Sequence, residues 1–187
     1  ASPIPGQRAR ICLNGEWDFR PGGDRSRAPG FGWTRLRVPG SWGPAHGFEF
    51  EVPDGTASVR HAWYRLRFRP PANWNDGRRV VLAFDGVTYA CRGYLNGQPV
   101  GEHVGGYAPF EFDIGSTLRF DGSNEFTLHV EDEIVPPGQQ GQSRHRGIWR
   151  SVYLGSVPRL QVDNVFVMPS VRRMELTVRT WVRNDTE

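Results

Sequence analysis

Apolar and polar residues alternate along most of this chain, and the alternation predicts a protein built from short β-strands. Residues 63–69 show the pattern clearly, because Tyr64, Leu66 and Phe68 alternate with Trp63 and three arginines. Side chains on a strand point to opposite faces in turn, so such a run indicates one buried face. The run 79–85 is apolar on both faces, which is typical of a strand covered on each side. Similar runs predict further strands at 16–19, 33–38, 91–96, 99–104, 110–114, 124–131, 148–154, 160–168 and 174–182.

Turn residues separate these predicted strands at intervals of roughly eight to twelve residues. The pair Asn96-Gly97 is the sharpest signal, because these two residue types most readily adopt positive φ in a two-residue hairpin turn. Gly105-Gly106 then ends the returning strand, and a third strand follows. The stretch 89–114 therefore predicts a β-meander that carries its own turns.

Two long segments rich in glycine and proline, 39–59 and 132–147, interrupt the strands. We expect the first to be an ordered surface loop held in place by Trp42, Phe48 and Phe50. The chain contains no pattern for a helix of three turns, no internal repeat and no low-complexity segment. The strands and turns together predict an all-β fold, a two-sheet β-sandwich with jelly-roll topology.

Composition agrees with a folded all-β domain and narrows the range of partners. The 23 glycines and 15 prolines supply many reversals, and the aromatic content of 12% excludes a disordered chain. The net charge is only +3, and the arginines of the chain are interspersed with acidic residues along its whole length. Because nucleic-acid binding needs basic residues gathered into a patch or stripe, we expect no nucleic-acid partner. Self-association is left open.

The sequence leaves the cellular compartment open. No apolar run approaches the ~20 residues of a membrane-spanning helix, so we expect a soluble protein with no membrane partner. No signal-peptide core is visible either. The chain begins with Ala-Ser-Pro and not with Met, which suggests a processed or cut product, either cytoplasmic or secreted.

Common catalytic signatures are absent from the sequence. It contains no Gly-x-Ser-x-Gly, no phosphate-binding glycine loop and no His-Glu-x-x-His, and no pair of carboxylates is singled out by its spacing. The acidic triplet Glu131, Asp132 and Glu133 could bind Ca²⁺ weakly. We favour a solvated strand end, because calcium needs about six or more oxygen ligands. We therefore expect no cofactor and no metal site.

The histidines and cysteines allow more than one interpretation. His129 points to the polar side of its predicted strand, so we expect it to be exposed, and His103 fits a turn residue as well as a ligand. Cys12 and Cys91 form no metal-ligand spacing with the histidines. Reduced, packed thiols are favoured, and a disulfide remains the alternative if the chain is exported.

Seven motifs, in this order, resemble the amino-terminal sugar-binding domain of glycoside hydrolase family 2. They are LNGEWDF (13–19), VPGSW (38–42), WYRLRF (63–68), LAFDGV (82–87), YLNGQPVGEHVGGYAPFEFDI (94–114), NEFTLHVED (124–132) and GIWRSVYL (147–154). The family includes β-galactosidases, β-glucuronidases and β-mannosidases. The resemblance implies a galactose-binding-domain-like jelly roll over residues 11–156, after a flexible tail of residues 1–10. Residues 157–187 resemble the first strands of the immunoglobulin-like second domain of the family, left incomplete here.

The resemblance also implies a division of labour within the parent protein. In such enzymes the acid and nucleophile glutamates lie in a later (β/α)8 barrel, so this domain is expected to be non-catalytic and inactive alone. Its expected partners are the downstream immunoglobulin-like and barrel domains of a retaining β-glycosidase. We expect it to bind carbohydrate weakly if at all.

Candidate substrate-proximal residues follow from the loop that precedes Gly147. β-Galactosidases and β-glucuronidases carry an Asp six positions before the Gly-Ile pair, and this sequence has Gly141 there. The family's direct sugar or ion contact from this domain therefore does not carry over, and galactosidase or glucuronidase specificity is left open. The polar residues nearby are our candidates for contacts with the sugar, the alternative being a surface loop that contacts the barrel: Gln142, Arg144, His145 and Arg146.

An independent carbohydrate-binding module is the alternative function. Jelly rolls often present aromatic side chains that stack on sugar rings, and Trp33, Trp42 and Trp74 could form such a platform. Ordinary packing of these indoles is the simpler interpretation, and the family resemblance does not require them to bind sugar.

Overall fold

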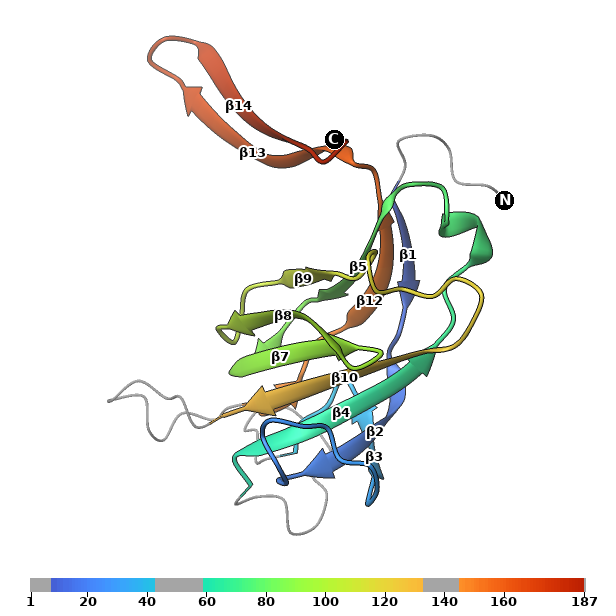
Figure 1. The fold of residues 1–187 in the computed structure, drawn as a ribbon. Coiled ribbons are helices and arrows are strands. Elements are labelled where there is room, and N and C mark those ends of the chain that lie inside the picture. Colours follow the sequence, from blue (N-terminus) through green and yellow to red (C-terminus); the bar gives the residue numbers. More distant parts are fainter. Residues whose placement is uncertain (1–7, 43–58, 133–144, 187) are drawn as a thin grey trace.

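A computed structural model describes residues 8–42, 59–132 and 145–186, which form two facing antiparallel sheets (Figure 1). The four-stranded sheet has the order β1-β12-β5-β9, with β1 at Ala9–Cys12, β12 at Val152–Val157, β5 at Arg79–Phe84 and β9 at Phe110–Asp113. The six-stranded sheet has the order β3-β2-β4-β10-β7-β8. Its strands are β3 (Thr34–Val38), β2 (Gly15–Pro21), β4 (His61–Phe68), β10 (Asn124–Glu131), β7 (Ala90–Leu95) and β8 (Gln98–Val104). The predicted all-β sandwich with jelly-roll topology is confirmed.

The remaining elements lie at the ends of the sandwich. Two short strands, β6 (Val87–Thr88) and β11 (Gly147–Ile148), pair with each other, and a single 3-10 turn covers Ala72–Trp74. The last two strands, β13 (Leu160–Ser170) and β14 (Glu175–Asn184), form a hairpin that projects from the sandwich (Figure 1). No helix within the described ranges is long and apolar enough to cross a membrane.

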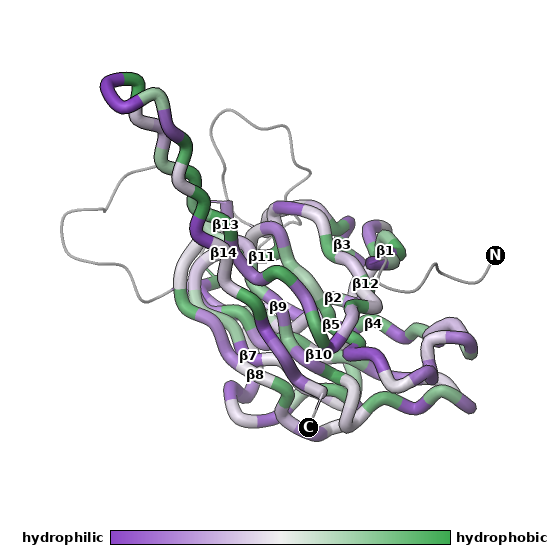
Figure 2. Tube along the Cα trace, turned by 90° about the horizontal axis from the view of Figure 1, so that it is seen from above, coloured by the Kyte–Doolittle hydropathy of each residue, from purple (hydrophilic) through white to green (hydrophobic). Residues whose placement is uncertain are grey.

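The core fills the space between the two sheets and is rich in aromatic rings. Trp17 packs edge-on against Tyr64 and Phe126, with ring centroids 6.5 and 6.4 Å apart. Each large side chain buried in this way contributes ~1.5 to 3 kcal/mol of transfer free energy. Five of the six residues of β5 are buried, so the prediction of a strand covered on both faces is confirmed. Figure 2 shows how hydrophobic and hydrophilic residues follow one another along the chain.

The predicted meander is half right. Asn96 and Gly97 have φ of 52° and 81°, and Leu95 pairs with Gln98, so the tight hairpin between β7 and β8 is confirmed. The third strand, β9, does not pair with β8. It crosses to the other sheet, where Phe112 pairs with Leu82 of β5, because the chain after Gly105 turns toward the opposite layer. Alternation predicts a strand but not the sheet that receives it.

The predicted tail and first loop lie largely outside the described residues. Within residues 1–10, only the last three are described, and Ala9 and Arg10 already belong to β1. Of the three aromatics expected to hold the segment 39–59, Trp42 is fully buried, while Phe48 and Phe50 fall outside the described ranges.

The prediction of an exposed His129 is wrong, because the outer face of the six-stranded sheet is covered at this point. His129 is only 1% exposed and packs against the ring of Trp63 at 4.7 Å. The indole N–H of Trp63 in turn donates to the backbone carbonyl of Asp24 at 2.7 Å, so the loop after β2 covers this region. His129 Nε2 lies 3.2 Å from His61 Nδ1, and its Nδ1 lies 3.3 Å from the Glu131 carboxylate.

Acid is expected to destabilise the fold through His129. Burial, together with the nearby His61, lowers the pKa of His129 from its ordinary 6.5 to about 4. His129 therefore takes up a proton near pH 6.5 in the unfolded chain but only near pH 4 in the folded chain. The contribution of neutral His129 to the free energy of unfolding is fully present above pH 6.5. It falls by up to about 3 kcal/mol as the pH drops toward 4. Urea unfolding at a series of pH values measures this slope.

The matched variant for this measurement is His129→Phe, which keeps an aromatic ring beneath Trp63 and removes the titrating group. Its stability should fall less steeply between pH 6.5 and 4 than that of the parent chain. Equal slopes for the two proteins would contradict the assignment to His129.

The remaining histidine and cysteine predictions are partly resolved. His103 lies within β8, and not in a turn, and its ring stacks on Phe110 with centroids 4.0 Å apart. Both cysteines are free thiols. Cys91 is buried as expected, and burial raises its pKa to about 12, but Cys12 is exposed, so the expectation that both thiols are packed is wrong for Cys12.

Candidate functional site

Stretches of chain from four parts of the sequence meet at one end of the sandwich, where β10 ends and β11 begins. The backbone N–H of Gly40 donates to Ile148, that of Trp42 to Arg146, and that of Asp132 to Arg60, over 2.7 to 3.3 Å. The ranges 43–58 and 133–144 are therefore both bounded by residues of this region. We call this group the loop anchor: Ser41, Trp42, Arg60, Tyr64, Asp132, Arg146 and Gly147.

An ion pair lies at the centre of the loop anchor. Arg146 Nε donates to the Asp132 carboxylate at 2.8 Å, and the two side chains are 11% and 1% exposed. Arg60 adds a second cation 3.5 Å from the same carboxylate but is 51% exposed. The backbone N–H of Arg146 also donates to the Ser41 hydroxyl at 3.0 Å. A buried pair of this kind fixes the position of its backbone, because neither charge can leave its partner without a large desolvation cost.

Gly147 permits the chain to pass directly over two buried aromatic rings. Its φ is +100°, and a Cβ at this position would collide with the Tyr64 hydroxyl and lie 2.8 Å from the Trp42 ring. The next backbone N–H, that of Ile148, points to the Tyr64 hydroxyl at 3.4 Å. Burial raises the pKa of Tyr64, so its hydroxyl stays neutral and can accept this hydrogen bond.

His145 belongs to an aromatic stack beside the loop anchor. Its ring lies 4.8 Å from that of Trp149 in a stacked arrangement, and Tyr107 meets the same indole edge-on at 5.6 Å. The Trp149 indole N–H donates to the carbonyl of Gly106 at 2.9 Å. Burial lowers the pKa of His145, which favours the neutral ring at neutral pH.

The structure places two of the four predicted site residues, and Gln142 and Arg144 lie outside the described ranges. His145 and Arg146 are both buried and contact the domain itself. No sequence pattern indicated that Asp132 and Ser41 are their partners, because the contacts that bury them join distant segments. Asp132 also corrects an expectation: it is a buried ion-pair partner and not a solvated strand end, while Glu133 falls outside the described ranges.

Neither a metal site nor the tryptophan platform is found in the described part of the chain. Its histidines, cysteines and acidic residues form no group of three or more that could hold a metal ion. Trp42 and Trp74 are 0% and 4% exposed, so neither offers a ring face to a sugar. Trp33 is half-buried, and the Arg65 guanidinium lies 4.3 Å from its ring. Ordinary packing, the interpretation favoured from the sequence, therefore describes these indoles, and the alternative of a three-indole platform is not supported.

Comparison with known proteins gives a consistent result. Residues 12–158 match the family described as glycosyl hydrolases family 2, sugar binding domain. A β-galactosidase of Thermoanaerobacter pseudethanolicus is 32% identical over 111 residues, covering 56% of this chain and 15% of that protein. The β-glucuronidase of Felis catus is 27% identical over 205 residues, covering 89% of this chain and 31% of that protein.

Solved structures show the same likeness. A calcium-binding mutant of Bacteroides uniformis β-glucuronidase 2 matches 96% of this chain with a TM-score of 0.79 and 27% identity. This chain covers only 23% of that protein. It thus spans less than a third of the length of each of these three relatives.

Proposed function

Because this chain belongs to glycoside hydrolase family 2, we propose that it serves as the non-catalytic amino-terminal part of a retaining β-glycosidase that breaks down carbohydrate. The jelly roll of residues 11–156 supports the segment 133–144 beside the sugar site of the parent enzyme. The acid and the nucleophile come from a later barrel domain. The parent's activity fits its relatives, which are named as β-galactosidases and β-glucuronidases.

The loop anchor is the observation that carries this proposal. A buried ion pair joins the residues on the two sides of one polar segment, Asp132 and Arg146, and the positive-φ glycine Gly147 follows that segment. Fixed ends reduce the conformational freedom that a loop loses when it meets a ligand. We propose that Gln142 and Arg144 contact the sugar, while His145 and Arg146 hold the end of the segment in position.

The hairpin supports the proposal that residues 157–187 begin an immunoglobulin-like second domain. In the paired register, one face of β13 and β14 carries Val165, Val167, Leu176 and Val178, all of them exposed. A lone two-stranded hairpin is marginally stable in water, and an apolar face needs cover from another layer. Further strands of the same domain would supply that cover.

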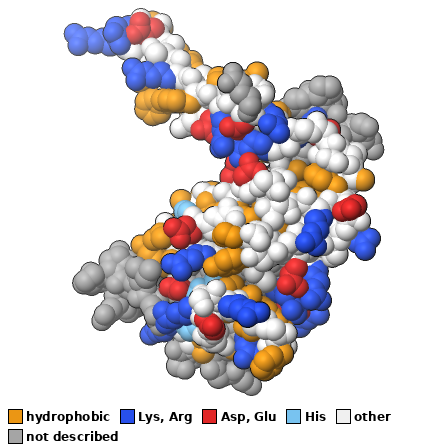
Figure 3. Space-filling model, in the orientation of Figure 1, with side chains coloured by type: hydrophobic (Ala, Val, Ile, Leu, Met, Phe, Trp, Pro, Cys, Tyr) orange, Lys and Arg blue, Asp and Glu red, His pale blue; other side chains and the backbone are white. Residues whose placement is uncertain are grey.

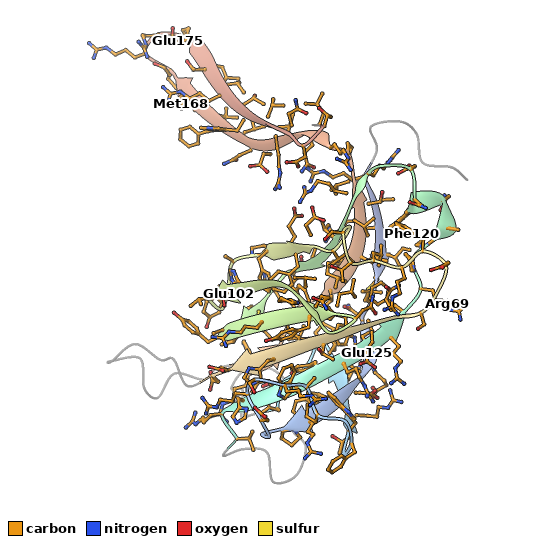
Figure 4. The ribbon with its side chains drawn as sticks, in the orientation of Figure 1. Arg69, Glu102, Phe120, Glu125, Met168 and Glu175 are labelled. Carbon is orange, nitrogen blue, oxygen red and sulfur yellow. The ribbon has the colours of Figure 1, made fainter. Side chains whose placement is uncertain are left out.

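The test of the proposed function uses the full-length enzyme and its best β-glycoside substrate. Arg144→Ala removes a charged contact and is expected to lower kcat/KM roughly tenfold or more. Gln142→Ala removes a neutral contact and is expected to lower kcat/KM by less. Such hydrogen bonds contribute ~1 to 3 kcal/mol. The control is Arg69→Ala, an exposed arginine at the other end of β4 from the loop anchor (Figure 4). It should leave kcat/KM unchanged.

Two results would contradict this proposal. Unchanged kcat/KM in both Arg144→Ala and Gln142→Ala would show that the segment 133–144 does not contact the sugar. Hydrolysis of a β-glycoside by the 187-residue chain alone would show that the domain is itself catalytic.

A further inference from the structure

The joint between the sandwich and the hairpin contains a concentrated ionic network. Only Pro158 and Arg159 separate the end of β12 from the start of β13. A cleft of about 850 Å³ lies at this joint, lined by side chains from both sides. Figure 3 shows basic and acidic side chains gathered where the hairpin meets the sandwich.

Arg79, at the start of β5, is the central cation of this joint. Its side chain is 7% exposed, and its Nε donates to the Asp113 carboxylate at 2.7 Å. Its Nη2 donates to Glu111 at 3.3 Å. The third carboxylate near Arg79, Asp185, comes from the hairpin side and lies 3.5 Å from Nε. One buried guanidinium thus links acids of β9 to the residue that follows β14.

Asp185 is held on the hairpin side by two further arginines. Arg183 Nε donates to its carboxylate at 2.7 Å. Arg159 Nη1 donates to its carbonyl at 3.0 Å, and the backbone N–H of Asp185 donates to the Arg159 carbonyl at 2.9 Å. The Arg159 guanidinium also donates to the carbonyl of Gly77 in the sandwich. The hairpin root is therefore tied to the sandwich at both of its strands.

The cations of the cleft are largely engaged with the chain itself. Arg79, Arg159 and Arg183 each bind carboxylates or carbonyls within the joint. A buried cation is costly to leave without any acidic partner, whereas exposed pairs contribute little. The arrangement therefore suits a mechanical link better than a site for an anionic ligand.

We propose that the Arg79–Asp185 pair is a latch that sets the orientation of the hairpin, and of whatever the hairpin carries, relative to the sandwich. Figure 4 shows how far the hairpin projects from the sandwich: Met168 and Glu175 lie near the far end of the hairpin, away from Glu102 and Glu125. A small rotation at Asp185 displaces that end by a large distance.

Distance measurement between two spin labels tests the latch in the 187-residue chain. The native thiol of Cys12 is exposed and takes one label, while Cys91 is buried and should stay unlabelled. The second label is attached through Val171→Cys at the exposed tip of the hairpin. Pulsed electron spin resonance is expected to give one narrow distance peak for the parent chain. In Asp185→Asn and in Arg79→Met, that peak is expected to broaden into a wide distribution.

Asp163→Asn is the control, because Asp163 is an exposed aspartate of β13 that does not line the cleft at the joint. It should retain the narrow peak. Asp185→Asn leaves Arg79 paired with Asp113 and Glu111, so its sandwich should melt at the parent temperature, and this variant decides the matter even if Arg79→Met does not fold. A narrow peak retained in Asp185→Asn, or a broad distribution already present in the parent chain, overturns the proposal.

Discussion

Replacing Arg146 by Met is expected to lower the free energy of unfolding by about 3 to 5 kcal/mol, the usual cost of removing one partner from a buried ion pair. Asp132 would then keep a buried carboxylate without this guanidinium, while the half-exposed Arg60 lies 3.5 Å from it. Met retains much of the apolar stem of the arginine, so lost packing contributes little. Urea unfolding of the 187-residue chain, followed by tryptophan fluorescence, measures the loss.

Two further variants show whether the buried pair is the cause. Arg60→Gln removes the exposed cation from the same carboxylate and should cost less than about 1 kcal/mol. The double variant Asp132→Asn with Arg146→Met should cost clearly less than the sum of its two single changes, because neither charge is left without the other. Strict additivity would contradict the buried pair.

Gly147→Ala is expected to cost between about 2 and 5 kcal/mol, from backbone strain at φ of +100° and from overpacking against Tyr64 and Trp42. The strain arises because an L-residue rarely adopts this conformation, and the overpacking arises because both rings are fully buried. Thermal or urea unfolding of the 187-residue chain detects a loss of this size. In the full-length enzyme, the same change should impair activity by displacing the segment 133–144.

The hairpin turn offers a control that separates strain from overpacking. Gly97→Ala carries positive φ, at +81°, but a Cβ there meets no atom within 4 Å. It should therefore cost only about 1 to 2 kcal/mol. If Gly147→Ala cost no more than Gly97→Ala, the close approach to Tyr64 and Trp42 would have no energetic weight.

Strand positions and the main turn were predictable because they depend on neighbours in the sequence. The alternation around Tyr64 requires one buried face, and Asn96-Gly97 requires positive φ at adjacent positions. Both are local properties of the backbone. The strands and turns already favoured a sandwich with jelly-roll topology, and the order of motifs added the family.

Two of the misplaced residues, His129 and Asp132, share one physical cause, which is burial by segments distant in the sequence. His129 lies on the polar side of its strand and is buried because Trp63 and the loop after β2 cover it. Asp132 is buried because Arg146 closes over it from beyond an intervening segment. A periodic pattern of apolar and polar residues does not indicate burial by a distant segment. The loop anchor is therefore visible only in the structure, whereas the sequence indicated only that a polar segment ends near Gly147.

The pairing of the first strand with the twelfth has a consequence for how the chain is made. Ala9 lies opposite Ser156, so the edge of the four-stranded sheet joins residues from nearly opposite ends of the jelly roll. At synthesis rates of about 5 to 20 residues per second, the first strand waits roughly 7 to 30 s for its partner to be translated. During that time its row of backbone donors and acceptors stays unpaired. Completion of the sandwich is therefore a late event on the ribosome, and this long-range closure makes slow folding the expected behaviour.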